Sequence, residues 1–348
     1  MFQDCLLGSA TSAYQLDLCS FRQIGHTGRD DQLRVHYDEY TLLNGRRERL
    51  VSRVGDGSIV VRFDRTPVPK DLSDVVCPHF LELKWATGCP YKCAWCYLQG
   101  TFRFLEYRTK PRPKDFNEVR RHLAAFFEGD GVRPEILNSG ELSDSLLTEK
   151  TKRPFSRFIM DVMATQKRHK VLFVTKSADI ENLLKISNPE QAIVSFSVNA
   201  ESVARRWEKA PKVSDRLKAA ERLKEAGFEV RIRIDPIVPV TGWTKHYSRL
   251  VDTVFERFTP DRITLGSLRG LQSTINNARD KSWIVYLGET SNWGKKIETQ
   301  MRLDMYSTLI HQLRDDYGFD RVALCKETKA MWGALGLNYR RISCNCTP

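Results

Sequence analysis

The sequence predicts an α/β protein whose parallel sheet curves into a partial (β/α)6 TIM-like barrel with N-terminal and C-terminal extensions. Short apolar segments recur six times between residues 80 and 266, and amphipathic segments with apolar spacings of three and four residues lie between them. Strands that alternate with helices in this way are typical of a parallel sheet. The 348 residues, 41% of them apolar, are enough to bury a large core.

Three regions are expected along the chain. The N-terminal extension, residues 1–78, has a turn signal at Gly55-Asp56-Gly57 followed by apolar alternation in 58-SIVVRFD-64, which predicts a short β-hairpin. The core, residues 79–270, is expected to hold strands at 80–86, 134–138, 170–175, 191–197, 228–235 and 261–266. Its helices are expected at 115–128, 153–167, 178–185, 214–226 and 245–257. The C-terminal extension, residues 271–348, is expected to pack on the barrel with a helix near 298–315, a strand at 321–325 and the tail 343-SCNCTP-348.

Composition limits the partners and the compartment. Lysine and arginine outnumber acidic residues by 55 to 43, and the net charge of +12 attracts polyanions such as nucleic acid. Since the basic residues are dispersed, a basic enzyme without such a partner is the alternative. No apolar run predicts a membrane span, and 1-MFQDCLLGSATSAY-14 lacks the features of a signal peptide. We therefore expect a cytoplasmic protein with no membrane partner, whose nine cysteines are ligands or free thiols.

A cluster of thiols is the strongest chemical signal. The stretch 87-TGCPYKCAWCYLQGT-101 places Cys89, Cys93 and Cys96 within eight residues, on a loop that follows the first core strand. Zinc sites usually take four ligands, often as two C-x2-C pairs, and no second pair stands nearby, so zinc is the less favoured alternative. Three cysteines on one loop suit a [4Fe-4S] cluster, in which each thiolate binds one iron and the fourth iron is left open for a small molecule.

This arrangement, with Trp95 just before the last cysteine, resembles the radical S-adenosylmethionine superfamily. The resemblance implies that the open iron binds the amino and carboxylate groups of S-adenosylmethionine. One electron from the reduced cluster, supplied by a flavodoxin- or ferredoxin-type donor, then gives a 5'-deoxyadenosyl radical. The cofactor performs this chemistry, and the protein supplies orientation and excludes water.

The same resemblance implies a cofactor contact after the second strand, because ligands of such barrels bind at the carboxyl ends of the strands. There, 138-NSGELSD-144 is similar to the Gly-Gly-Glu turn of the superfamily. Glu141, with Ser139 and Gly140 beside it, is thus expected to meet the ammonium group of the cofactor. An ordinary turn that caps a helix is the alternative.

Later strands end in further candidate contacts of the cofactor. Lys176 follows the third strand and is expected to meet the cofactor carboxylate as a point charge. Ser197 and Asn199, two residues apart on the fourth strand, project to the same side and are candidates for the ribose hydroxyls. Arg233 and Asp235 lie at the end of the fifth strand, where Arg233 is a candidate cofactor ligand.

Within the superfamily, the chain resembles the spore photoproduct lyase group over about residues 78–270. The resemblance rests on 89-CPYKCAWCYLQGT-101, the TKS segment at 175–177, SFSVN at 195–199, and R-I-R-I-D-P-I-x-P at 231–239. It implies repair of a thymine dimer in DNA: the radical removes a hydrogen from the methylene bridge of the lesion, the cross-link fragments, and a cysteine returns a hydrogen. Tyr97 resembles a tyrosine with which the family relays hydrogen; packing beside the cluster is its alternative role.

One departure from the family pattern concerns the hydrogen donor. The donor cysteine is expected just after the second strand, but 136-ILNSGELSDSLL-147 contains no cysteine. Glu141 or Ser139 takes that neighbourhood, and neither a carboxylate nor a hydroxyl donates a hydrogen atom easily. Cys325, at the end of the strand 321-RVALC-325, is expected at the barrel mouth as a substitute; a small buried apolar cysteine is the alternative.

Other features of the sequence leave two interpretations each. Cys344 and Cys346 of the tail are either ligands of an auxiliary cluster or exposed thiols. The segments 108-RTKPRPK-114 and 203-VARRWEK-209 are either groups that hold phosphates, with Trp207 stacked on a base, or a solvated basic surface.

The sequence thus predicts a radical S-adenosylmethionine enzyme that acts on a nucleic-acid base or a thymine-derived substrate. A DNA lesion would have to be flipped out of the duplex to reach the barrel mouth. One alternative keeps the radical chemistry and acts on a small metabolite or a peptide. Another is a non-catalytic, metal-stabilised nucleic-acid binding protein.

Overall fold

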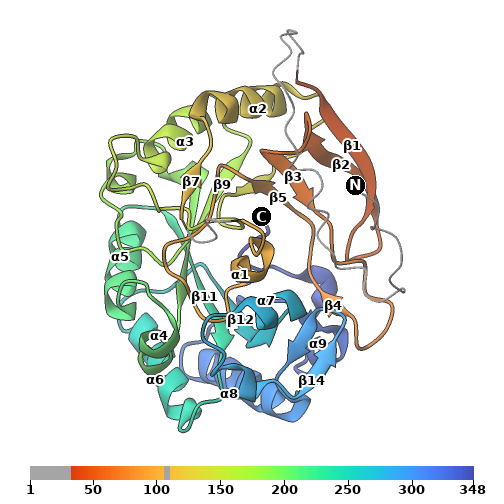
Figure 1. The fold of residues 1–348 in the computed structure, drawn as a ribbon, viewed down its shortest axis with the longest axis vertical. Coiled ribbons are helices and arrows are strands. Elements are labelled where there is room, and N and C mark those ends of the chain that lie inside the picture. Colours follow the sequence, from red (N-terminus) through yellow and green to blue (C-terminus); the bar gives the residue numbers. More distant parts are fainter. Residues whose placement is uncertain (1–32, 106–109) are drawn as a thin grey trace, which may run out of the picture. The chain divides into compact units, whose positions relative to one another are not determined.

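A mixed sheet of ten strands organises the chain, in the order β1-β2-β3-β5-β8-β9-β10-β11-β12-β16 (Figure 1). It is seen in a computed structural model that describes residues 33–105 and 110–348. The strands are β1 (Val35–Thr41), β2 (Arg47–Val54), β3 (Val60–Phe63), β5 (Phe80–Leu83), β8 (Ile136–Asn138), β9 (Lys170–Thr175), β10 (Ala192–Val198), β11 (Glu229–Ile237), β12 (Arg262–Ser267) and β16 (Val322–Leu324). Neighbouring strands are parallel from β5 to β16 and antiparallel from β1 to β5. The predicted α/β class with a large parallel sheet is confirmed.

Short strands form three smaller sheets beside the main one. They are β4 (Val75–Val76) with β17 (Glu327–Thr328), β6 (Ala86–Thr87) with β7 (Arg112–Pro113), and β13 (Arg269–Gly270) with β15 (Gly294–Lys296) and β14 (Glu289–Ser291). The β4–β17 pair joins the segment before β5 to the segment after β16. The segments just outside the first and last parallel strands, β5 and β16, are therefore joined by this pair.

The helices are α1 (Leu98–Thr101), α2 (Phe116–Glu128), α3 (Phe155–Met163), α4 (Glu201–Trp207), α5 (Val213–Glu225), α6 (Trp243–Phe255), α7 (Gln272–Asn277), α8 (Thr299–Asp315) and α9 (Lys329–Ala334). Figure 1 shows α2, α3, α5, α6 and α8 around the outside of the sheet. These five confirm the helices predicted at 115–128, 153–167, 214–226, 245–257 and 298–315. Among the described helices, none is both long and apolar enough to cross a membrane.

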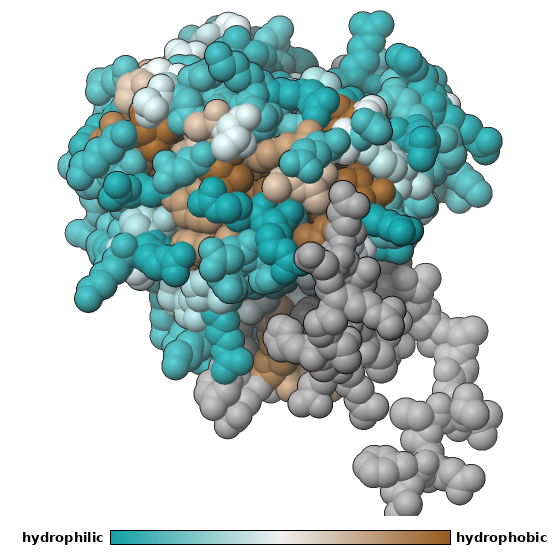
Figure 2. Space-filling view, turned by 90° about the horizontal axis from the view of Figure 1, so that it is seen from above, coloured by the Kyte–Doolittle hydropathy of each residue, from teal (hydrophilic) through white to brown (hydrophobic). Residues whose placement is uncertain are grey.

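Helix α2 illustrates how the sequence sets these elements. Asp115 caps its start, because the side-chain Oδ1 accepts a hydrogen bond of 2.9 Å from the Asn117 amide. Val119, Leu123 and Phe126, spaced by four and three residues, are fully buried, which places one face of the helix against the core. Figure 2, a view from the side of α2 and α3, shows mainly hydrophilic residues on this outer face, with apolar residues gathered in a band between them.

The helix predicted at 178–185 is wrong. Only Leu183–Lys185 forms a single 3-10 turn there. Thr175 Oγ1 accepts a hydrogen bond from the Ser177 amide, and Ser177 Oγ accepts one from the Asp179 amide. These local side-chain bonds compete with helical backbone bonds and hold the segment as a turn.

The N-terminal hairpin is confirmed. Strands β2 and β3 pair antiparallel on either side of Gly55-Asp56-Gly57, with Arg53 opposite Val61. Strand β3 also pairs with β5, so this part of the predicted N-terminal extension continues the main sheet. Residues 1–32, which include Cys5 and Cys19, lie outside the described residues.

The C-terminal tail (residues 343–348) lies on the face of the sheet opposite the helices, and Figure 1 marks the C-terminus within the arc of strands. Its contacts include the side chains of Ser195 on β10, Arg231 on β11 and Thr264 on β12. These side chains point to the same face because they occupy neighbouring register positions of parallel strands. The tail therefore borders the polar face of the sheet.

Candidate active site

The predicted cluster ligands lie on a loop between β6 and α1, beyond the carboxyl end of β5. Gln99 holds the loop from within: its Nε2 donates to the backbone oxygens of Cys93 and Ala94, both at 2.9 Å. The segment after α4 holds it from outside, because the Ala94 amide donates to Trp207 O and the Lys209 amide donates to Tyr91 O. The thiol-bearing loop is thus fixed by the fold itself.

Trp207 does not serve as an exposed base-stacking residue. It is 3% exposed, its indole N–H donates to Ser282 Oγ at 2.9 Å, and its ring lies 5.6 Å from that of Trp95. The ring supports the cysteine loop because burying an aromatic side chain there fills the space beneath Trp95. Arg205 and Arg206, on the same short helix, are exposed, as expected for a solvated basic surface. Residues 106–109, which overlap the other basic segment, lie outside the described residues.

Burial on its own favours the protonated form of the three thiols of the loop. Burial raises the pKa of Cys89, Cys93 and Cys96 to about 12 each. Metal ligation reverses this effect, because the cation stabilises the thiolates. In the described part of the chain, no three His, Cys, Asp or Glu side chains are arranged to hold a single metal ion. A [4Fe-4S] cluster does not require three side chains around one metal ion, since each thiolate binds a different iron.

The turn after β8 holds the predicted residues Ser139, Gly140 and Glu141. Ser139 is 1% exposed and its Oγ donates to Leu172 O at 2.9 Å, so its hydroxyl ties the turn to β9. Gly140 allows a close approach to β9, because a Cβ here would lie 2.5 Å from Val174 Cβ. Of the three residues, Glu141 has the side chain that remains available to a ligand.

Asp144 anchors the other end of this turn. Its carboxylate accepts hydrogen bonds from Thr175 Oγ1 at 2.8 Å and from the amides of Lys176 and Leu146 at 2.7 and 2.9 Å. Burial nevertheless raises its pKa above the usual range. The turn after β8 and the end of β9 are therefore one connected unit.

Tyr97 and Glu141 are brought together, although 44 residues separate them. The Tyr97 hydroxyl donates to the Glu141 backbone oxygen and lies 3.3 Å from its carboxylate Oε2. The other carboxylate oxygen, Oε1, accepts from Asn138 Nδ2 at 2.9 Å. Since Tyr97 follows Cys96 directly, this contact links the cysteine loop to the turn after β8.

Lys176 belongs to a buried group of three charges. Its Nζ lies 3.3 Å from Glu208 Oε1, and Arg216 Nη1 lies 2.8 Å from Glu208 Oε2. The side chains of Lys176, Glu208 and Arg216 are 15%, 0% and 1% exposed. Burial acts to raise the pKa of Glu208, but the two cations outweigh it and hold the pKa below its usual range. No sequence motif pointed to Glu208, which fixes Lys176 in place as a cation.

The predicted ribose contacts differ from each other. Ser197 is buried on β10, and its backbone oxygen accepts from Arg216 Nη1 at 3.0 Å. Asn199 is fully buried, with Nδ2 donating to Pro236 O at 2.8 Å and Oδ1 accepting from the Tyr247 hydroxyl at 2.7 Å. A ribose contact at Asn199 would therefore require one of these bonds to be exchanged.

Arg233 faces a thiol of the tail. Its Nη2 lies 3.1 Å from Cys346 Sγ, and its Nε is buried without a hydrogen-bond partner in the described part of the chain. Asp235 forms a two-point ion pair with Arg269, with both N···O distances 2.9 Å. Arg269 Nη2 also lies 3.4 Å from Cys325 Sγ. Two thiols, Cys325 and Cys346, thus border the charged groups at the end of β11.

This arrangement was compared with known proteins. The spore photoproduct lyase family is matched over residues 79–265, more than half of the chain. The chain belongs to the spore photoproduct lyase family. Curated members include the spore photoproduct lyases of Clostridium acetobutylicum, 22% identical over 174 residues, and of Bacillus subtilis, 26% identical over 173 residues. Each alignment covers 49% of this chain, and 50% and 49% of those relatives, so the chain spans about half the length of the curated relatives it matches.

Solved structures of spore photoproduct lyase share the fold. One, complexed with dinucleoside spore photoproduct, aligns over 70% of this chain and 75% of its own with a TM-score of 0.59 and 17% identity. Another, a double mutant with bound AdoMet and dinucleoside spore photoproduct, aligns over 71% and 76% with a TM-score of 0.59 and 16% identity. At this identity the likeness concerns the fold.

In this member of the spore photoproduct lyase family, the tail cysteines are not exposed thiols. Cys344 and Cys346 are 6% and 9% exposed. Cys77, which carries no sequence motif, is also buried, and it interacts electrostatically with Cys325 and Cys344. Sequence patterns could not bring these four thiols together, because they come from three distant segments.

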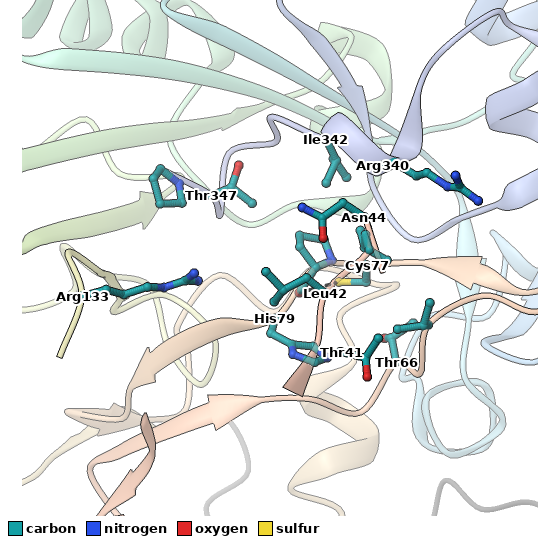
Figure 3. Close-up of a pocket in the computed structure, with 14 residues that line it drawn as sticks. Thr41, Leu42, Asn44, Thr66, Cys77, His79, Arg133, Arg340, Ile342 and Thr347 are labelled. Carbon is teal, nitrogen blue, oxygen red and sulfur yellow. Dashed lines mark hydrogen bonds between the residues drawn. The ribbon is translucent and has the colours of Figure 1, made fainter. Parts of the chain in front are cut away.

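A pocket of about 170 Å³ opens behind the tail. Figure 3 shows residues of the tail region, such as Ile342 and Thr347, on one side and Cys77 and His79 on the other. Pockets for small-molecule ligands usually measure about 300 to 1,000 Å³. This pocket is therefore too small for a dinucleotide, and the site described above is the better candidate for substrate.

Proposed function

We propose that this chain is a radical S-adenosylmethionine lyase that acts on a nucleic-acid base, a thymine lesion of the spore photoproduct type in particular. The proposal rests on one observation. The loop with three thiols is held by hydrogen bonds at the carboxyl ends of parallel strands, in a chain of this family. The relatives named above are lyases for this lesion, and ligands of parallel α/β sheets bind at this edge. The finer shape we propose for the sheet is a partial TIM-like barrel with its mouth there.

The residues of the loop would hold the metal. Cys89, Cys93 and Cys96 would bind three irons of a [4Fe-4S] cluster and leave the fourth open for S-adenosylmethionine. When bound and reduced by a flavodoxin- or ferredoxin-type donor, this pair supplies a 5'-deoxyadenosyl radical that takes hydrogen from the substrate. The loop, held by its hydrogen bonds, would keep the three thiols in place and exclude water.

Other residues at this edge would orient the cofactor. Lys176, held as a cation by Glu208, would meet the carboxylate of S-adenosylmethionine. Glu141, next to Ser139 and Gly140, would accept a hydrogen bond from the ammonium group with its carboxylate. Ser197 and Asn199 remain our candidates for the ribose, and Arg233 for a further polar contact of cofactor or substrate.

The substrate side of the proposal rests on charge and on the hydrogen relay. A net charge of +12 favours a polyanion, and a lesion flipped from DNA would reach this edge of the sheet. The Tyr97 hydroxyl, bonded to Glu141, would relay hydrogen between the reaction centre and a thiol. Cys325 and Cys346 are the candidate thiols near Arg233.

An anaerobic assay tests the proposal. Reconstituted protein, S-adenosylmethionine and dithionite would be incubated with a dinucleotide that carries the spore photoproduct, and 5'-deoxyadenosine and restored thymines would be measured by mass spectrometry. We expect both products. Deoxyadenosine without restored thymines would indicate that the substrate is a small metabolite or a peptide. The missing cysteine at 136–147 favours this alternative. Neither product, with zinc rather than iron in the protein, would support a non-catalytic nucleic-acid binding protein.

A further inference from the structure

The tail is held in place by a dense polar network. Asn345 is fully buried, and its Nδ2 donates to Ser195 Oγ at 2.8 Å and to Ile232 O at 3.0 Å. Its Oδ1 accepts from Thr264 Oγ1 at 2.7 Å, and its amide donates back to the same hydroxyl at 2.9 Å. One side chain thus contacts three strands, which fixes the residue that follows it, Cys346.

Arg231 adds a charged clamp on the tail backbone. Its Nη1 donates to Asn345 O at 3.0 Å and to Thr347 O at 2.7 Å, on both sides of Cys346. The guanidinium is 1% exposed and is paired with Glu229. A buried charge is retained only when it is paired and hydrogen-bonded, and here the tail supplies part of that bonding. The position of Cys346 is therefore set by the sheet and not by chance packing of a chain end.

Cys346 lies at the end of a chain of polar contacts that starts at the cysteine loop. Tyr97 OH lies 3.3 Å from Glu141 Oε2, and Glu141 Oε1 accepts from Asn138 Nδ2 at 2.9 Å. The same Nδ2 lies 3.9 Å from Cys346 Sγ, which is 3.1 Å from Arg233 Nη2. The thiol therefore shares Asn138 with Glu141, which lies in the segment where the expected cysteine is absent.

Cys325 is placed differently. Its Sγ lies 3.4 Å from Arg269 Nη2, whose guanidinium is already bound to both carboxylate oxygens of Asp235. Among the hydrogen bonds of the described residues, none joins Cys325 to Tyr97, Glu141 or Asn138. Of the two thiols near Arg233, Cys346 is the one connected to Tyr97, through Asn138 and Glu141.

We propose that Cys346, delivered by the C-terminal tail, is the thiol that donates a hydrogen atom to the product radical. This inference rests on the proposed function. The S–H bond of Cys346 breaks homolytically, a C–H bond forms on the carbon radical of the product, and a thiyl radical remains on the sulfur. One electron from a low-potential iron-sulfur or flavin protein and one proton then restore the thiol.

One feature of the surroundings supports this role. The Nε of Arg233 is a buried donor without a partner in the described part of the chain, so it can bind a carbonyl or phosphate oxygen of a substrate beside the thiol.

The test compares three serine variants of the full chain: Cys346→Ser, its tail neighbour Cys344→Ser as the matched control, and Cys325→Ser. Each reconstituted protein would receive the spore photoproduct dinucleotide, S-adenosylmethionine and dithionite in D2O. For the wild type and Cys344→Ser, we expect restored thymine that carries deuterium. Cys346→Ser should still form 5'-deoxyadenosine and lose the restored, deuterated thymine to radical by-products.

A second readout does not depend on turnover. The protein without cofactors would be alkylated with iodoacetamide, with and without the dinucleotide, and its peptides would be weighed. We expect the dinucleotide to slow alkylation of Cys346 more than that of Cys77, which faces the pocket behind the tail. The unfolding temperatures of the variants would show that serine has not displaced the tail.

The outcomes separate the two proposals. Restored, deuterated thymine from Cys346→Ser at the wild-type level overturns the role of Cys346, and loss of it in Cys325→Ser alone gives that role to Cys325. Equal alkylation of Cys346 with and without the dinucleotide also counts against it. If the wild type forms neither deoxyadenosine nor thymine, the proposed function itself fails, and the hydrogen-donor role fails with it.

Discussion

Replacing Glu208 by glutamine tests the charge arrangement that fixes Lys176. Glu208 has a fully buried side chain between two cations, at 3.3 Å from Lys176 and 2.8 Å from Arg216. Glutamine keeps the shape and removes the charge. The substitution therefore leaves two buried cations without their shared counter-ion.

The size of the effect follows from these distances. At an effective dielectric constant of about 20, each pair attracts by about 5 to 6 kcal/mol, and lost hydration of the ions offsets much of this. Breaking a buried pair by removing one partner usually costs about 3 to 5 kcal/mol. With a slope of about 3 kcal/mol per M in urea, the unfolding midpoint should fall by about 1 to 1.7 M.

The measurement is urea unfolding of the full chain, followed by circular dichroism. Glu256→Gln is the matched control, because Glu256 pairs with Arg249 at 2.6 Å but the two side chains are 53% and 65% exposed. An exposed pair contributes about 0 to 1 kcal/mol, so the control midpoint should hardly move. Equal shifts for the two variants would refute the reasoning, since burial would then make no difference.

Three further predictions concern the metal loop, the turn after β8 and a buried histidine. Cys93→Ala should lose the iron and the visible absorption of the reconstituted protein, and retention of both would contradict the assigned ligand set. Gly140→Ala should destabilise the fold by about 1 to 3 kcal/mol, because its Cβ would meet Val174 Cβ at 2.5 Å; in Gly333→Ala, where nothing lies within 4 Å, denaturation should show no loss. Burial, then Arg168, lowers the pKa of His169 to about 4, below the usual value of about 6.5. Because the unfolded chain binds this proton more readily, His169 contributes stability above about pH 6.5 that is lost as the pH falls towards 4, and His169→Gln should flatten the pH dependence of unfolding in that window.

The elements that the sequence predicts well are those with a local signal. Strand β9 spans Lys170–Thr175, as its apolar run indicates, and α2 starts after the Asp115 cap. The failure at 178–185 has the same local origin, since apolar spacing suggested a helix while the hydroxyls of Thr175 and Ser177 bond to the nearby backbone. Periodicity records where apolar residues lie, and it does not record which side chains take backbone hydrogen bonds.

The position of a candidate residue was predictable where one strand end carries it. Cys93 and Glu141 could be found from motifs because the order of strand ends in a parallel sheet follows the order of the chain. Glu208 and Trp207 could not, because their roles appear only when the segment after α4 pairs with the cysteine loop. The basic segment 203–209 therefore looks like an exposed surface in the sequence. In the structure, two of its residues, Trp207 and Glu208, are buried and support the cysteine loop and Lys176.

The tail shows the limit of local reasoning most clearly. Asn345 bonds to residues 81, 113 and 150 positions away, on three different strands. No spacing rule relates these positions, yet together they decide where Cys346 lies. The missing cysteine after β8 and the buried thiol of the tail are therefore two separate observations in the sequence, and they meet only in the folded chain, at Glu141. If a thiol is needed at that point, the fold allows the C-terminal tail to supply it, and the polar network around Asn345 gives a physical reason for this source.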